Sequence, residues 1–136
     1  MERMRKKLAA LPPWTFSFLT VILILWLTLA PKPLGDEPPQ LFPGADKVVH
    51  AIMFGFLTVV LLTDFQRRRL WRSLRWKVVI FFILISSAFG SLIEVCQLKM
   101  GMGRGFEWED IIADSAGAII CGVIWGFLQS KWVRRA

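Results

Sequence analysis

Four long, mainly apolar runs constrain what this chain can fold into more than any other feature of its sequence. They cover residues 14–30, 47–63, 78–98 and 110–129. A helix needs about 20 residues to cross about 30 Å of hydrocarbon, and each run approaches that length. Because 55% of the 136 residues are hydrophobic, a soluble domain of this size could not bury its apolar surface. The sequence therefore predicts one all-α domain over residues 1–136, an integral membrane four-helix bundle.

The first run could also be the hydrophobic part of a signal peptide. Such a segment usually has about 7–15 apolar residues and ends in small residues that a peptidase accepts. Here the run is longer, and its only candidate exit, Thr28-Leu29-Ala30, is followed by Pro31. We therefore expect an uncleaved first span.

Basic residues gather on one side of the predicted four-span topology. The N-terminal segment 3–7, the connection 67–77 and the C-terminal segment 131–135 hold 13 of the 17 Lys and Arg residues. Basic residues favour the cytoplasmic side of a membrane, so both termini are predicted to be cytoplasmic. This clustering explains the net charge of +7 without a nucleic-acid partner. The basic layer either sets the topology alone or also attracts anionic membrane lipids.

Three pairs of polar residues lie near the opposite, outer ends of the predicted spans. The pairs are Asp46 and His50, Glu94 and Gln97, and Asp110 and Asp114. Spacings of three or four residues place both members of each pair on one helical face. Ionisable groups within a span are costly, so they usually face a partner, a cavity or a functional site. We predict one outer-leaflet polar site, built from residues 46–50, 94–97 and 104–114.

The connection before the last span is rich in glycine and contains Arg104. Glycines let backbone N–H groups approach a ligand closely, and the N-terminus of the following helix favours an anion. The guanidinium group of Arg104 would add a positive charge that can donate two hydrogen bonds to a phosphate or a carboxylate. The alternative is that Arg104 only neutralises acidic residues of the same site.

His50 is the only histidine of the chain. It is either a structural hydrogen-bonding group or an acid/base group. Together with Glu94, Asp110 and Asp114 it could also bind a divalent metal through nitrogen and oxygen ligands. Because no His-Glu-x-x-His or Cys-x-x-Cys spacing supports such a site, the prediction includes no metal and no cofactor.

The last predicted span carries small residues at every fourth position, at Ala118, Gly122 and Gly126. Small residues with this spacing let two helices approach closely. We expect this face to pack against another helix, and it is a candidate face for a homo-oligomer.

Taken together, these motifs resemble the VanZ-like family of small bacterial membrane proteins. The matching pieces lie within residues 46–122 and are Asp46-Lys47-x-x-His50, Glu94-x-x-Gln97, Gly103-Arg104, Asp110 and Gly117. Where the family typically has asparagine, this chain has Asp114, which adds an ionisable group. The resemblance implies a protein of the bacterial cytoplasmic membrane. It also implies a link to resistance against glycopeptide antibiotics such as teicoplanin, by a mechanism that the family pattern does not explain.

Three functions remain open on these observations. The leading hypothesis is an outer-leaflet site that binds or modifies a cell-envelope ligand, such as a lipid-linked phosphate or a glycopeptide. The second is an enzyme in which His50 or Glu94 acts as a general acid or base on a lipid-linked substrate, with or without a metal. The third is a structural or assembly subunit, in which the charged cluster only holds helices together. The expected partners are membrane lipids and the envelope ligand.

Overall fold

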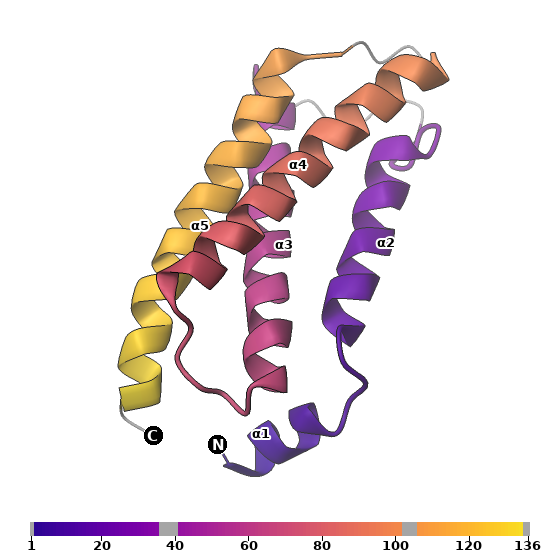
Figure 1. Cartoon of the computed structure of the whole chain (residues 1–136). Coiled ribbons are helices and arrows are strands. Elements are labelled where there is room, and N and C mark those ends of the chain that lie inside the picture. Colours follow the sequence, from indigo (N-terminus) through magenta and orange to yellow (C-terminus); the bar gives the residue numbers. More distant parts are fainter. Residues whose placement is uncertain (1, 36–40, 102–105, 135–136) are drawn as a thin grey trace.

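The computed structural model describes residues 2–35, 41–101 and 106–134, and within them the chain is all-helical. Its elements are α1 (Glu2–Ala9), α2 (Thr15–Leu29), α3 (Ala45–Arg68), α4 (Trp76–Met100) and α5 (Trp108–Arg134). The four longer helices run alongside one another, and the short α1 lies across one end of the group (Figure 1). The predicted all-α class is therefore confirmed.

Three of these helices, α3, α4 and α5, are long and apolar enough to cross a membrane. The apolar helix α2 has only 15 residues, which corresponds to a length of about 22 Å. That length is shorter than the usual hydrocarbon thickness of about 30 Å. A membrane protein with three candidate spans is thus supported, whereas a fourth crossing by α2 stays a prediction.

Three of the observed helices extend beyond the predicted apolar runs, whereas α2 lies within its run of residues 14–30. α3 continues to Arg68 although its apolar run was predicted to end at residue 63, and α4 and α5 also begin before and end after their predicted runs. The reason is that hydropathy marks the part of a helix that suits lipid, whereas backbone hydrogen bonding continues through charged turns. The sequence analysis made no prediction for the segment that forms α1. In this helix an exposed ion pair of 3.1 Å joins Lys6 to Glu2, one turn earlier.

The distribution of apolar and polar side chains is the reverse of that in a soluble protein. Large apolar side chains point outward on each of the four longer helices, as at Phe18, Ile52, Leu84 and Ile112, each more than 60% exposed. Ionisable groups such as Glu94 are fully buried at the same time. Outward apolar and inward polar side chains are expected where the surrounding solvent is lipid.

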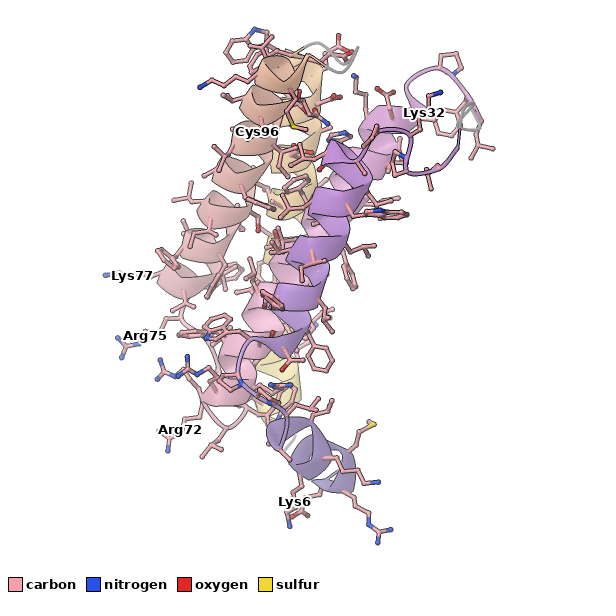
Figure 2. The ribbon with its side chains drawn as sticks, turned by 90° about the vertical axis from the view of Figure 1, so that its right-hand side faces the viewer. Lys6, Lys32, Arg72, Arg75, Lys77 and Cys96 are labelled. Carbon is pink, nitrogen blue, oxygen red and sulfur yellow. The ribbon has the colours of Figure 1, made fainter. Side chains whose placement is uncertain are left out.

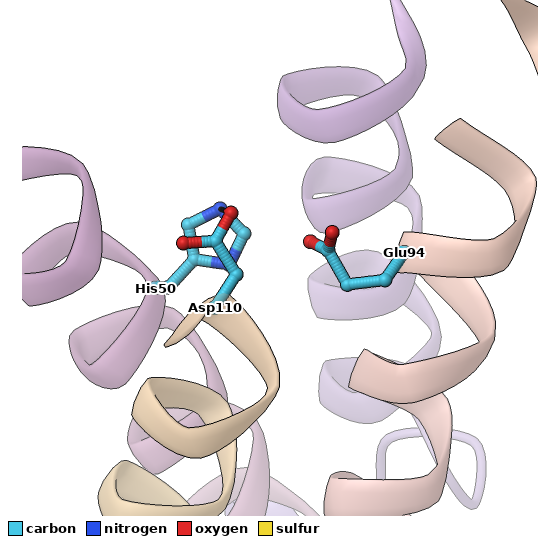
Figure 3. A group of neighbouring side chains, drawn as sticks. All are labelled: His50, Glu94 and Asp110. Carbon is cyan, nitrogen blue, oxygen red and sulfur yellow. Dashed lines mark ion pairs between the residues drawn. The ribbon is translucent and has the colours of Figure 1, made fainter. Parts of the chain in front are cut away.

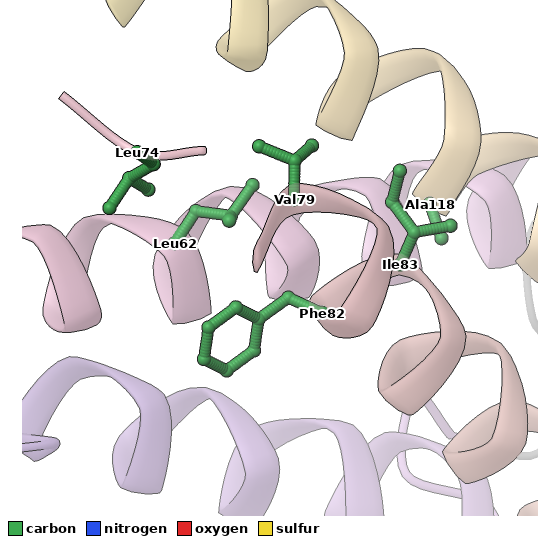
Figure 4. Close-up of a cluster of buried hydrophobic side chains, with 6 residues drawn as sticks. All are labelled: Leu62, Leu74, Val79, Phe82, Ile83 and Ala118. Carbon is green, nitrogen blue, oxygen red and sulfur yellow. The ribbon is translucent and has the colours of Figure 1, made fainter. Parts of the chain in front are cut away.

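One hydrophobic cluster joins α3, the α3–α4 connection, α4 and α5. Its buried members are Leu62, Leu74, Val79, Phe82, Ile83 and Ala118 (Figure 4). Aromatic rings extend it toward α2, where Trp14 lies 6.2 Å from Phe82 between ring centroids. The second apolar cluster lies closer to α2 and includes Ile24, Phe54 and Ile93.

The small-residue face of α5 packs within the chain. A Cβ atom added at Gly122 would lie 2.6 Å from the Ile83 side chain of α4, and one at Gly126 would lie 2.7 Å from the Trp76 ring. Ala118 is fully buried. The close helix packing predicted from these residues therefore occurs between α5 and α4, and association of chains through this face stays a prediction.

The two ends of the helix group differ in composition. We call the end that holds the start of α3 and the end of α4 the His50 end, and the opposite end the Asp64 end. Basic side chains at the Asp64 end, among them Lys6, Arg72, Arg75 and Lys77, point away from the helices (Figure 2). The basic segments thus share one end, as the predicted topology requires, and their cytoplasmic location stays a prediction.

Candidate functional site

His50 is the centre of the polar cluster at the His50 end. Its side chain is buried in the first turns of α3, and its Nδ1 lies 2.9 Å from Asp114 Oδ1 on α5. A carboxylate accepts hydrogen bonds, so Nδ1 carries the proton in this pair, and the lone pair of the neutral imidazole is then on Nε2. The Nε2 atom lies 4.0 Å from Asp110 Oδ2. Two turns of α5 thereby orient one imidazole.

Two glycines make room for this pair. A Cβ atom added at Gly90 of α4 would lie 2.5 Å from Asp114 Oδ2, so only glycine lets that carboxylate sit between the helices. A Cβ atom at Gly117 would collide with the backbone carbonyl of Ala51. Because Ala51 follows His50 directly, this close approach of α5 to α3 brings Asp114 within hydrogen-bond distance of the imidazole.

Glu94 approaches the same place from α4. Its side chain is fully buried, and its Oε2 accepts a hydrogen bond from the Glu107 backbone N–H at 3.3 Å. Its Oε1 is buried without a hydrogen-bond partner among the described residues. Figure 3 shows the Glu94 carboxylate pointing across the gap toward Asp110 and His50. Ligand atoms of these three residues lie within 4.8 Å of one another.

Lys47 holds the acidic rim of the cluster together. Its Nζ lies 2.6 Å from Asp110 Oδ1 and 3.0 Å from Asp46 Oδ2, and it also pairs with Glu107. A fourth carboxylate, that of Glu109, lies 3.9 Å away. Lys47 and Glu107 lie within the predicted site ranges 46–50 and 104–114, but neither was predicted as a ligand-binding residue. The available signal was a single lysine opposite the acid-rich start of the last span.

The remaining predicted residues have different positions. Asp46 is exposed at the rim, although it shares a face with His50 in the sequence pattern. Gln97 is buried, and its Nε2 donates a hydrogen bond of 2.8 Å to the Thr28 carbonyl of α2. Arg104 lies outside the described residues, together with the rest of the segment 102–105.

A cavity of about 660 Å³ opens beside the cluster. It lies between the end of α2, the connection that follows it and the start of α3, and Gln97 contributes from α4. Most of its wall is apolar, as at Leu29 and Met53, and its polar lining includes His50 and Asp46. Glu94, Asp110 and Asp114 are not lining residues, so His50 is the buried residue that the cavity and the cluster share, while Asp46 lines the cavity from the exposed rim.

The cluster carries more negative than positive groups. Six carboxylates of the described residues take part in its contacts, and their only nitrogen partners among side chains there are Lys47 and His50. The six belong to Asp46, Glu94, Glu107, Glu109, Asp110 and Asp114. Such an excess, close to the lipid region, suits a bound cation, a proton-transfer group or a polar ligand head.

Comparisons with known proteins support the resemblance drawn from the motifs. The family model described as VanZ/LLP1 matches residues 4–129, nearly the whole chain. Neither the curated proteins nor the solved structures contain a match to this sequence.

Proposed function

The chain belongs to the VanZ/LLP1 family. We propose that its His50 end binds the head group of an amphiphilic cell-envelope ligand, and the second candidate function is that it also modifies this ligand. The ligand class that we favour is a lipid-linked phosphate in the outer leaflet of the bacterial cytoplasmic membrane. A glycopeptide is the alternative ligand, and a role in glycopeptide resistance would follow from it.

The cavity supports an amphiphilic ligand. Its volume of about 660 Å³ lies within the usual range for small-molecule sites, about 300–1,000 Å³. Apolar side chains such as Leu29 and Met53 would contact a hydrocarbon segment, whereas His50 and Gln97 offer polar contacts on the same wall. A wall of this composition suits a molecule with a lipid part and a polar head.

The shared position of His50 is the observation that carries the proposal. This imidazole lines the cavity, and its Nδ1 is committed to Asp114 in the buried cluster. A ligand head that enters the cavity would therefore meet a nitrogen whose orientation is already fixed. An isolated structural histidine would need neither the cavity nor a second acid near Nε2.

A phosphate in the cavity needs cationic groups near it. Lys47 is engaged by several carboxylates of the rim, and Lys32 lines the cavity. Arg104 and the start of α5 are the anion-binding elements predicted from the sequence. On this proposal a phosphate binds beside His50 and is neutralised by Lys32 and Arg104 or by a bound cation.

Binding of a labelled prenyl phosphate to the full chain in nanodiscs of neutral lipid tests the proposal. Val49→Trp would fill part of the cavity, and Ile52→Trp alters an exposed neighbour on α3 that does not line it. We expect Val49→Trp and His50→Gln to weaken binding at least tenfold and Ile52→Trp to leave it unchanged. Equal affinities for the wild type and the three variants would contradict the proposal that the ligand binds in this cavity. Arg104→Ala tests the anion-binding loop separately. If the prenyl phosphate does not bind but a glycopeptide does, and Val49→Trp and His50→Gln weaken that binding while Ile52→Trp does not, the ligand is a glycopeptide.

An enzymatic function is the second candidate, and the His50–Asp114 hydrogen bond favours it. A carboxylate on Nδ1 fixes the tautomer in which Nε2 accepts a proton, which is the arrangement of a general base. Release of inorganic phosphate from a prenyl phosphate would be measured with wild type, His50→Gln and Asp114→Asn. Turnover that both variants lose, while folding and ligand binding persist in Asp114→Asn, would establish chemistry. Binding without turnover in the wild type would leave a binding module.

A further inference from the structure

Three side chains from three helices place possible metal-ligand atoms close together. His50 of α3, Glu94 of α4 and Asp110 of α5 each offer an atom, and all three atoms lie within 4.8 Å of one another. From this geometry we propose that His50, Glu94 and Asp110 bind one divalent transition-metal ion, of which Zn²⁺ and Mn²⁺ are the best matched. The sequence analysis considered a metal at His50, Glu94, Asp110 and Asp114 but did not predict one, because no His-Glu-x-x-His or Cys-x-x-Cys spacing supports it.

The state of Glu94 points to a ligand independently of the clustering. Its side chain is fully buried, yet Oε1 has no hydrogen-bond partner among the described residues. A buried polar atom without a partner is unfavourable, and more so if it is charged. Figure 3 shows this carboxylate aimed at the space beside His50 and Asp110. A cation there would remove that cost.

Each proposed ligand is also oriented by a further group. Asp114 accepts the Nδ1 hydrogen bond of His50, which leaves Nε2 for the metal. The Glu107 N–H binds Oε2 of Glu94, which leaves Oε1. Partners of this kind orient the ligands of known metal sites and usually strengthen them.

Asp110 has the same division between its two oxygens. Lys47 contacts Oδ1 at 2.6 Å, whereas Oδ2 faces His50 Nε2 at 4.0 Å. In the described part of the chain, these contacts leave one atom of each residue uncommitted, namely Nε2 of His50, Oε1 of Glu94 and Oδ2 of Asp110.

The donor set decides the class of ion. One imidazole nitrogen with two carboxylate oxygens suits Zn²⁺ or Mn²⁺, whereas Ca²⁺ and Mg²⁺ prefer oxygen ligands alone. Ligand atoms around a single ion lie about 3–4 Å apart, so the side chains need to close by about 1 Å. Three protein ligands leave a coordination position for water or a ligand head. Coordination of a phosphate there rests on the proposed function, but the metal site itself does not.

Metal content and the absorption spectrum of a Co²⁺-loaded sample test the site in the full purified chain. After loading and dialysis we expect about one Zn²⁺ or Mn²⁺ per chain, and visible Co²⁺ bands typical of mixed nitrogen and oxygen ligands. Glu94→Gln and His50→Gln should each weaken binding at least a hundredfold. Asp114→Asn, which keeps a hydrogen-bond acceptor for His50, should weaken it about 10–100-fold.

Asp46→Asn is the matched control, because Asp46, Glu107 and Asp110 form a second, more exposed group of possible ligands. We expect this variant to bind metal as the wild type does. Loss in Asp46→Asn with retention in Glu94→Gln would move the ion to the rim and overturn the assignment. Gel filtration shows whether each variant is folded and monodisperse. Identical Co²⁺ bands in the wild type and in a monodisperse His50→Gln variant would also overturn the assignment of the metal to His50.

The outcome also separates this inference from the proposed function. Wild-type protein that retains no metal but binds prenyl phosphate with the Val49→Trp pattern would refute the metal and keep the ligand site. Metal binding with no affinity for prenyl phosphate in metal-loaded protein would support the metal site and refute that ligand.

Discussion

The two ends of the helix group both bury polar side chains, but they satisfy them differently. At the Asp64 end, the backbone N–H and the hydroxyl of Ser17 each donate a hydrogen bond of 2.8 Å to Asp64 Oδ2. The other oxygen of Asp64 lies 3.7 Å from Arg67 Nε, so one buried negative charge faces one buried positive charge. Arg67 in turn donates to the Pro12 carbonyl at 3.0 Å.

A second network at the Asp64 end is made of amides. Gln129 Oε1 accepts hydrogen bonds from the Leu74 N–H at 2.9 Å and from Gln66 at 3.2 Å, and its Nε2 donates to the Leu74 carbonyl. One side chain of α5 therefore holds both backbone groups of Leu74 in the α3–α4 connection. These contacts connect chain segments and offer nothing to a ligand.

The His50 end has the opposite charge balance, because in the described part of the chain its six carboxylates have only Lys47 and His50 as side-chain nitrogen partners. Buried polar atoms without a hydrogen-bond partner occur at both ends, for example Glu94 Oε1 and Asp64 Oδ1, so the ends differ in charge balance and not in the completeness of their hydrogen bonds. Groups left in excess at one end, beside a cavity, indicate binding or chemistry there. In this chain a buried charged side chain does not by itself mark a site, whereas an excess of acidic over basic side chains does.

The largest stability effect is expected at the balanced end. Asp64→Ala would leave the buried Arg67 without its counter-ion, and removal of one partner of a buried pair costs about 3–5 kcal/mol. The free energy of unfolding, from titration with SDS in mixed micelles, measures this loss. The double variant Asp64→Leu with Arg67→Met should recover most of it, since an apolar pair has no charge left uncompensated. An Asp64→Ala protein as stable as the wild type would contradict the balance at this end.

A smaller loss is expected at the helix contact that positions His50. Gly117→Ala places a methyl group against the Ala51 carbonyl, and neither backbone can move without shifting α5 from α3. Overpacking of this kind typically costs about 1–3 kcal/mol. Gly122→Ala is the matched control, because the nearest atoms to its methyl group would belong to the Ile83 and Thr58 side chains, which can adjust more easily than a backbone. Equal losses in the two variants would show that the contact at Gly117 is not specially tight.

Glu94→Gln should have an effect of the opposite sign to Asp64→Ala. In the presence of a chelator, the amide replaces a buried ionisable group at an end that already has an excess of acids. We expect the free energy of unfolding to stay constant or to rise by about 1 kcal/mol, since the group is uncompensated. The same SDS titration measures it. A loss above about 2 kcal/mol would mean that the carboxylate holds the helices together, which is the structural hypothesis.

Much of the outline of this protein follows from its sequence, because hydropathy and spacing act within single helices. The positions of the apolar helices and the gathering of His50, Glu94, Asp110 and Asp114 at one end were predicted from those local patterns. The contacts between helices were not, because His50 and Asp114 lie 64 positions apart and their meeting depends on Gly117. Local spacing fixes which residues share a face, but it does not say which faces meet.

The limit of local spacing is clearest at Asp46. It was predicted to share a face with His50, and both residues line the cavity, but the Asp46 side chain is exposed whereas His50 is buried. The difference arises because α5 covers the second turn of α3 and leaves the first turn at the rim, where Lys47 collects the carboxylates. A pattern within α3 contains no information about where α5 begins.

Asp46→Asn should therefore have the smallest effect of the four substitutions. Its pair with Lys47 is exposed, and exposed ion pairs contribute about 0–1 kcal/mol. Lys47 also keeps its contacts with Glu107 and Asp110, so the rim stays connected. We expect a change below about 1 kcal/mol in the free energy of unfolding, decreasing further as salt is added. A larger loss that persists at high salt would mean that the rim is part of the buried cluster, and the division between an exposed rim and a buried imbalance at the His50 end would then be wrong.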